Sequence, residues 1–139
     1  MVLSLDQILK MKDLEHLEPR KEELQRIIDA LLLEMGKEYL SIGIGRNSFP
    51  FIVALHGLNV TGLDIDEGSL QYQKELSERY ALQLKEAGGS LKLVKVNVEN
   101  VSLKDLHRKF DYIECVNFTL RGEPESELAS ILLYFGKSA

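Results

Sequence analysis

Apolar residues near the start of the chain recur at the spacing of a helix. Over residues 20–35 they fall three or four positions apart, which places them on one stripe. The members of this stripe are Leu24, Ile27, Ile28, Leu31 and Leu32. Gly36 is a typical signal for the end of a helix, and a weaker helical pattern that Asp6 can cap comes before the stripe. We therefore predict an N-terminal helical segment, residues 1–36, that packs on the rest of the chain.

From residue 38 the pattern changes to short apolar runs separated by amphipathic helical stretches. Strands are predicted at 38–45, 58–64, 91–98 and 111–116. Helices are predicted between these strands, including one uninterrupted helix that begins after Asp66 or Ser69 and ends at Gly88. A last helix is predicted over 123–134, although 131–135 alone also suits a fifth strand.

Strands that alternate with helices indicate βαβ crossovers and a parallel sheet. The predicted fold is α/β, a Rossmann-like three-layer sandwich whose mostly parallel sheet begins with the strand order 3-2-1-4. No internal repeat or linker is present, so residues 37–139 are expected to form one core that makes a single domain with the helical segment before it. In such sheets the ligand crevice lies at the carboxyl ends of the strands, where the strand order reverses.

The first two predicted strands end in residues suited to a nucleoside ligand. Gly43 and Gly45 permit a tight turn close to a ligand, ahead of the free N–H groups of a helix start. Asp64 follows about 20 residues later, where a carboxylate can accept hydrogen bonds from both ribose hydroxyls. Each feature alone also fits a turn without a ligand or a solvated carboxylate. Because Asp66 is better placed to cap the next helix, Asp64 is left without a structural role, and together the features favour an adenosine-type ligand.

The third and fourth predicted strands are followed by amide side chains. Asn97 can both donate to and accept from the edge of an adenine, although a turn residue is an equally suitable interpretation. Asn117 would face the reactive end of the ligand. Cys115 is interpreted as a small buried hydrophobe and not as a nucleophile, because no histidine lies near it in the sequence.

Four segments resemble the class I S-adenosylmethionine-dependent methyltransferase family in order and spacing. They are YLSIGIGRNSF, VTGLDID, LVKVNVEN and FDYIECVNF, which are similar to the family's glycine motif, ribose-binding acid, adenine-side segment and fourth strand. The resemblance covers about residues 20 to 120. It implies S-adenosylmethionine as the cofactor and methyl transfer to an unidentified acceptor. It places these residues at the cofactor: Ser41, Gly43, Gly45, Asp64, Ile65, Asn97, Val98 and Asn117.

The resemblance also implies a role for each position. The two glycines would line the methionine part of the cofactor, and Asp64 would hold the ribose hydroxyls. Ile65 would pack on the adenine, whose edge Asn97 and Val98 would meet. Asn117 would lie near the sulfonium.

Several positions depart from the family's pattern. Ser41 stands where an acidic residue is usual, Asn47 where a third glycine is frequent, and Asn97 where an aspartate is common. Asn117 is not followed by the paired prolines of many amino-group methyltransferases. The chain is also expected to be truncated at its C-terminal end relative to the family, whose sheet continues for further strands. These departures keep open a second interpretation, a non-catalytic binding or scaffold module that acts through a partner or a homodimer.

A hydrophobic fourth strand at the edge of a sheet is a template for another chain. We therefore expect a homodimer or a partner protein to cover that edge. A nicotinamide dinucleotide protein is a third interpretation, which the sequence disfavours. Ser48 occupies the third glycine position of the G-x-G-x-x-G pattern, and no Tyr-x-x-x-Lys pair is present.

The composition mainly excludes certain classes of protein and certain kinds of site. The 139 residues are 45% hydrophobic and 28% charged, which excludes a disordered chain. A net charge of −5 lacks the broad positive field of nonspecific nucleic-acid binding, so a nucleic-acid partner is not indicated. One cysteine excludes an internal disulfide and a cysteine zinc site, and the scattered histidines give no reason to expect a metal. No apolar run is long enough to span a membrane and no signal peptide is evident, so a cytoplasmic location is expected.

Overall fold

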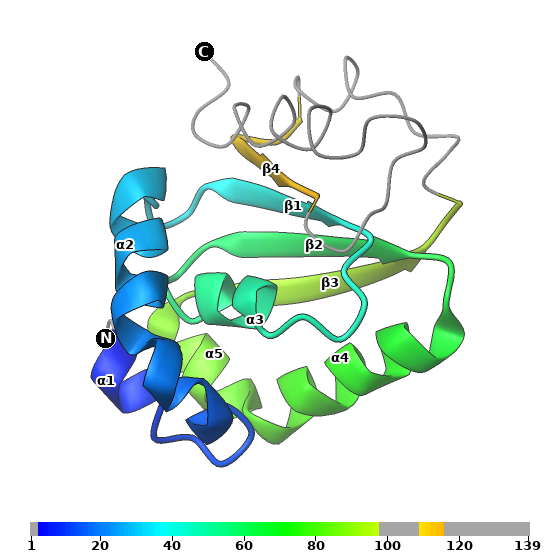
Figure 1. Ribbon diagram of the computed structural model, residues 1–139. Helices are drawn as coiled ribbons and strands as arrows, with labels where there is room; N and C mark the ends of the chain where they lie inside the picture. Colours follow the sequence, from blue (N-terminus) through cyan, green and yellow to red (C-terminus); the bar gives the residue numbers. More distant parts are fainter. Residues whose placement is uncertain (1–2, 98–108, 116–139) are drawn as a thin grey trace, which may run out of the picture.

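The computed structural model describes residues 3–97 and 109–115. A helical N-terminal segment leads into alternating strands and helices (Figure 1). In chain order the elements are α1 (Leu5–Ile8), the 3-10 helix η1 (Glu15–Arg20), α2 (Lys21–Leu31), β1 (Glu38–Ile42), α3 (Phe49–Ala54), β2 (Asn59–Asp64), α4 (Glu67–Arg79), α5 (Ala81–Ala87), β3 (Ser90–Lys95) and β4 (Tyr112–Glu114).

The strands form one sheet in the order β3-β2-β1-β4, and every neighbouring pair is parallel. The predicted α/β fold and its 3-2-1-4 strand order are therefore confirmed. The crossovers through α3 and through α4 and α5 lie on the same face of the sheet, as right-handed connections require when the strand order runs in one direction (Figure 1). The order reverses at β1, which has β2 on one side and β4 on the other.

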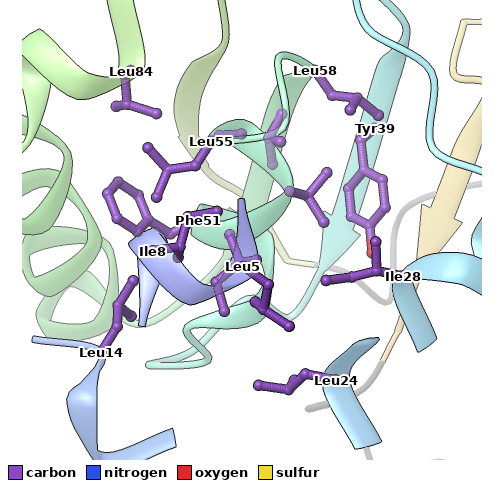
Figure 2. Packing of buried hydrophobic residues seen from close by; sticks show 14 of the residues in the cluster. Leu5, Ile8, Leu14, Leu24, Ile28, Tyr39, Phe51, Leu55, Leu58 and Leu84 are labelled. Carbon is purple, nitrogen blue, oxygen red and sulfur yellow. The ribbon is translucent and has the colours of Figure 1, made fainter. Parts of the chain in front are cut away.

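The helix-covered face of the sheet carries the main hydrophobic core, to which the N-terminal helices contribute (Figure 2). Leu5 and Ile8 of α1 are buried in the same cluster as Leu24 and Ile28 of α2 and Phe51 of α3. The hydrophobic effect thus holds the N-terminal segment and the first crossover together, because neither buries its apolar stripe alone.

Side chains alternate between the two faces of β1 and β4. Tyr39 and Tyr112 point to the helix-covered face, where their rings stack with centroids 5.9 Å apart. The Tyr112 hydroxyl donates to the Leu32 carbonyl at 2.8 Å, which ties the end of α2 to β4. Leu40 and Ile113 point to the opposite face and belong to a second, smaller hydrophobic cluster.

Three details of the N-terminal segment differ from the prediction. Ser4 caps α1 in place of Asp6, because the Ser4 hydroxyl accepts the Gln7 N–H at 3.2 Å and the Gln7 side chain accepts the Ser4 N–H at 2.9 Å. The second helix ends at Leu31 and not at Gly36, since Leu32 adopts a left-handed φ of 51°. Leu32 is also 72% exposed, so it does not belong to the buried stripe.

The long helix predicted before Gly88 is two helices, so that prediction was wrong. The break falls at Tyr80, whose φ of −112° and ψ of 30° are not helical. The Tyr80 hydroxyl donates to the Asp13 carboxylate at 2.7 Å, so a contact with the N-terminal segment favours the break over a continuous helix. The start was predicted correctly: the Asp66 carboxylate accepts the Ser69 N–H at 2.9 Å and caps α4.

Some predictions fall outside the described residues. They concern the helix at 123–134, its alternative strand at 131–135, and the site residues Val98 and Asn117. Within the described ranges β4 pairs with β1 only, so the expectation that a partner covers its other edge stays a prediction. No helix in the described part of the chain combines the length and the apolar character needed to cross a membrane.

Candidate functional site

A glycine turn connects β1 to α3. Gly43 and Gly45 have φ values of 69° and 53°, in the left-handed region that favours glycine. Between them the buried Ile44 donates its N–H to the Leu63 carbonyl at 2.9 Å, so the turn stays attached to β2. The chain therefore bends sharply at the carboxyl end of the sheet, where the sequence predicted a ligand crevice.

The Asp64 carboxylate joins this turn to the end of β2. One oxygen accepts the Gly45 N–H at 2.7 Å, and the other accepts the Asp66 N–H at 2.9 Å. The expectation that Asp64 has no structural role was therefore wrong. A carboxylate has about four acceptor positions, so two remain for a ligand after these two hydrogen bonds. The backbone bonds also fix the direction of the carboxylate, which prepares it for a diol.

Gln73 of α4 holds the same turn from the other side. Its fully buried amide donates to the carbonyls of Gly45 and Asn47 at 3.0 and 2.9 Å. The sequence reasoning missed this residue. The signal available was a polar side chain on the buried face of α4, between Ser69 and Leu76.

The residues after the glycines complete the turn. The Asn47 side chain accepts the Phe49 N–H at 3.1 Å, as expected of a residue near the start of a helix, whereas Ser48 makes no capping hydrogen bond. The Arg46 guanidinium lies over the Tyr72 ring, 5.3 Å from its centroid, which is a cation–π contact with α4. The turn is therefore held by both β2 and α4.

The other predicted site residues take different positions. Ile65 follows Asp64, the last residue of β2, and its apolar side chain is 59% exposed. Asn97 is exposed and lies beyond β3, which ends at Lys95, earlier than predicted. Ser41 is buried within β1, so its side chain is not at the surface of the turn. The structure thus brings Gly43, Gly45, Asp64 and Ile65 to one place, and their contact with a cofactor remains a prediction.

Glu114 is a second residue that the sequence reasoning missed. It is paired in register with Ser41 across β1 and β4, and it is only 1% exposed. Burial raises the pKa of Glu114 to about 7, although the hydroxyls of Ser41 and Tyr39 favour the charged form. Its Oε1 atom has no hydrogen-bond partner among the described residues. The available signal was an acidic residue inside an otherwise apolar strand.

Cys115, next to Glu114, behaves as a structural residue. It is 2% exposed and belongs to the smaller hydrophobic cluster. Burial, followed by the nearby Glu114 charge, raises its pKa to about 11. A thiol with such a pKa is a poor nucleophile near neutral pH, which agrees with its interpretation as a small hydrophobe.

A cavity of about 820 Å³ adjoins the glycine turn. Its described lining comes from η1, α2, residues 46–48 and α3, together with Glu114 of β4. Asp64 and Ile65 are not part of this lining, so the cavity is distinct from the predicted ribose site. A second cavity, of about 640 Å³, lies between α4 and β3. Within the described ranges no group of three acidic, histidine or cysteine side chains is placed to hold a metal.

Comparisons with known proteins bear on the fold. No family model matches the chain, and no curated protein does. Among solved structures, the SAM-dependent methyltransferase from Geobacter sulfurreducens in complex with S-adenosyl-L-homocysteine is 23% identical with a TM-score of 0.56, and the match covers 79% of this chain and 43% of that one. The corresponding enzyme from Thiobacillus denitrificans is 24% identical with a TM-score of 0.54, over 78% of this chain and 42% of that one.

A third match is magnesium protoporphyrin IX methyltransferase from Synechocystis with bound SAH. It is 19% identical with a TM-score of 0.56, and the match covers 83% of this chain and 51% of that one. The chain thus spans about half the length of these solved structures, or less. At this level of identity the comparisons establish the architecture: the chain has the fold of class I SAM-dependent methyltransferases.

Proposed function

We propose that this chain binds S-adenosylmethionine at the carboxyl ends of β1 and β2 and transfers its methyl group to an acceptor. The observation that carries the proposal is the Asp64 carboxylate, held by the Gly45 and Asp66 N–H groups at the edge of the glycine turn. Two of its acceptor positions remain for the two ribose hydroxyls. The solved structures of the same fold contain S-adenosylhomocysteine, which has this ribose.

Each residue at this edge has a distinct task in the proposal. The glycines allow the methionine part of the cofactor to approach the backbone closely, since no Cβ atom intervenes. Ile65, which is largely exposed, offers an apolar surface to the adenine. Asn97 and Val98 flank the adenine edge, and Asn117 lies toward the sulfonium; these three positions rest on the resemblance alone.

Methyl transfer requires little from the protein beyond the alignment of the cofactor and the acceptor. The bound cofactor supplies a methyl group already activated by a positive sulfur. The chain's residues orient the ribose and the methionine part and exclude water from the reacting atoms, and such positioning can provide much of the rate enhancement. A dedicated acid or base at the cofactor is therefore not required for binding and alignment.

The second candidate is a non-catalytic binding or scaffold module with this fold. The observation in its favour is that both Asp64 oxygens already accept backbone N–H groups, so the residue has a role without a ligand. In this case the turn is purely architectural, and the chain acts through a partner or a second copy.

Calorimetric titration of the full chain with S-adenosylhomocysteine separates the two candidates. The first requires saturable binding that Asp64→Ala weakens at least about tenfold, since a lost charge-assisted hydrogen bond contributes roughly 1.5–3 kcal/mol. Asp29→Ala, which removes an exposed carboxylate on α2, is the matched control and should bind like the parent chain. An absence of heat at millimolar ligand would leave the module as the better account.

A further inference from the structure

The cavity beside the glycine turn has mostly apolar walls and one deeply placed acid. Its apolar lining comes from η1, α2 and α3 and includes Leu17, Leu24, Ile27, Leu31, Phe49 and Ile52. Glu114 lines the same cavity although it is only 1% exposed, which places it at the inner wall. A volume of about 820 Å³ is in the range of small-molecule sites.

One oxygen of Glu114 is unsatisfied among the described residues of this wall, although the hydroxyls of Ser41 and Tyr39 favour the charged form of the carboxyl. Its Oε1 atom has no hydrogen-bond partner within the described ranges, and none of the ion pairs among those residues includes it. Buried polar atoms are nearly always hydrogen-bonded, so a carboxylate oxygen in a cavity wall that has no partner among the described residues is available to accept a hydrogen bond from a ligand.

The two arginines that line the cavity are engaged elsewhere, and the third basic residue of the described lining is His16. Arg20 donates to Glu23 through Nε and Nη2 at 3.2 and 3.0 Å. Arg46 lies over the Tyr72 ring. Neither guanidinium therefore neutralises Glu114 in this arrangement, and the carboxylate remains the charged group that a ligand meets at the inner wall.

The chemistry of these walls selects the ligand. A carboxylate oxygen in apolar surroundings is best matched by a cation that brings N–H donors, whereas an anion or a pure acceptor leaves it unsatisfied. Apolar walls favour a ligand with a hydrocarbon body. We propose that this cavity binds an organic amine, whose ammonium donates to Glu114 Oε1 while its apolar body packs against α2 and α3.

This inference extends to the methyl acceptor, and that extension rests on the proposed function. The cavity reaches the turn residues Arg46, Asn47 and Ser48, so a ligand in it lies next to the segment that would hold the cofactor. The ammonium passes one proton to the Glu114 carboxylate. The freed nitrogen lone pair then forms the N–CH3 bond while the S–CH3 bond breaks, and sulfur keeps that bonding pair. A carboxyl with a pKa of about 7 is suited to receive such a proton near neutral pH.

The test compares amines with alcohols of the same shape. The full chain, without cofactor, is titrated at pH 8 with phenethylamine and tryptamine, and with 2-phenylethanol and tryptophol. Saturation-transfer NMR and calorimetry report binding. We expect at least one amine to bind, at least about tenfold more tightly than its alcohol. Glu114→Gln keeps the shape and removes the charge, so it should abolish this preference. Glu78→Gln, an exposed carboxylate on α4, is the matched control and should preserve it.

Thermal unfolding of each variant shows whether it is folded. If Glu114→Gln does not fold, the proposal is judged only on whether the parent chain prefers the amine over the alcohol. The proposal is overturned if neither amine binds, if amine and alcohol bind equally, or if folded Glu114→Gln keeps the preference. Titration with S-adenosylhomocysteine is a separate measurement. Amine binding without cofactor binding would refute the proposed function and support the amine site. Cofactor binding without amine binding would support the proposed function and refute the amine site.

Discussion

The backbone N–H of Gly45 donates to the Asp64 carboxylate over 2.7 Å, which connects the turn after β1 to the last residue of β2. Two segments that are 19 residues apart in the chain thus share one short, charge-assisted hydrogen bond. The residue that the proposed function assigns to the ribose is also a support of the glycine turn. Substitutions at Asp64 should therefore change stability and affinity together.

Asp64→Ala should lower the free energy of unfolding by about 1–3 kcal/mol, because it leaves two backbone N–H groups without their acceptor. Urea denaturation followed by circular dichroism measures this change. The same variant should lose affinity for S-adenosylhomocysteine. Unchanged stability would show that water replaces the carboxylate without loss, and the turn would then not depend on Asp64.

Gln73 should be as important to the turn as Asp64. Gln73→Leu removes both donors to the Gly45 and Asn47 carbonyls, and we expect a loss of about 1–3 kcal/mol in unfolding free energy. Gln73→Glu should cost more, because it places a carboxylate against two carbonyl oxygens in a buried position. Denaturant titrations of the two variants provide the comparison. A Gln73→Glu variant as stable as the parent chain would contradict the contact.

The Glu114 carboxyl should make stability depend on pH. Its pKa in the folded chain is about 7, above the ordinary value of 4.5, because burial disfavours the charged form. A carboxyl whose pKa is raised on folding stabilises the fold fully at pH values below its pKa in the unfolded chain. This contribution is lost as the pH rises through its pKa in the folded chain. Between pH 5 and pH 8 the loss should be about 2–3 kcal/mol.

Glu114→Gln isolates this effect, since the amide does not titrate. Denaturant titrations at pH 5, 6.5 and 8 should show a flatter profile for this variant than for the parent chain. The remaining titrating groups are the same in both proteins, so their effects cancel in the comparison. Parallel profiles would mean that Glu114 titrates at its ordinary pKa in the folded chain.

Alanine substitutions at two glycines test the packing, because they should change the stability in opposite directions. A Cβ atom on Gly89 would lie 1.8 Å from the Ala54 carbonyl oxygen, so Gly89→Ala should destabilise the chain by more than about 2 kcal/mol. Gly68 lies in α4, where a Cβ would come no closer than 3.4 Å to the Asp66 carboxylate. Gly68→Ala should therefore stabilise the helix by about 0.5–1 kcal/mol. Melting temperatures that shift in the same direction would contradict this assignment.

The strand order and the position of the glycine turn were predictable because they depend on local signals. Alternating strand and helix patterns imply a parallel sheet, and Gly43 and Gly45 mark the bend that their positive φ values confirm. The Asp66 cap was likewise readable from spacing. These features need only neighbouring residues, so a single sequence contains them.

The features that were missed depend on residues far apart in the chain. Tyr80, where the helix breaks, contacts Asp13 of the N-terminal segment, and no helical pattern near Tyr80 signals the break. Gln73 resembled an ordinary polar helix residue until the turn was placed against it. Glu114 resembled an isolated acid in a strand, and only the folded structure shows that it is buried beside a cavity that α2 also lines.

The hydrogen bonds from Asp64 and Gln73 to the glycine turn also affect how the chain folds. The amide of Gln73 reaches back 28 residues to Gly45, and both Asp64 and Gln73 come later in the chain than the turn they hold. Loop closure over such separations makes folding slower than local helix formation does. We therefore expect the bend near residue 45 to take its final shape only after β2 and α4 have been synthesised and the first crossover docks against the second.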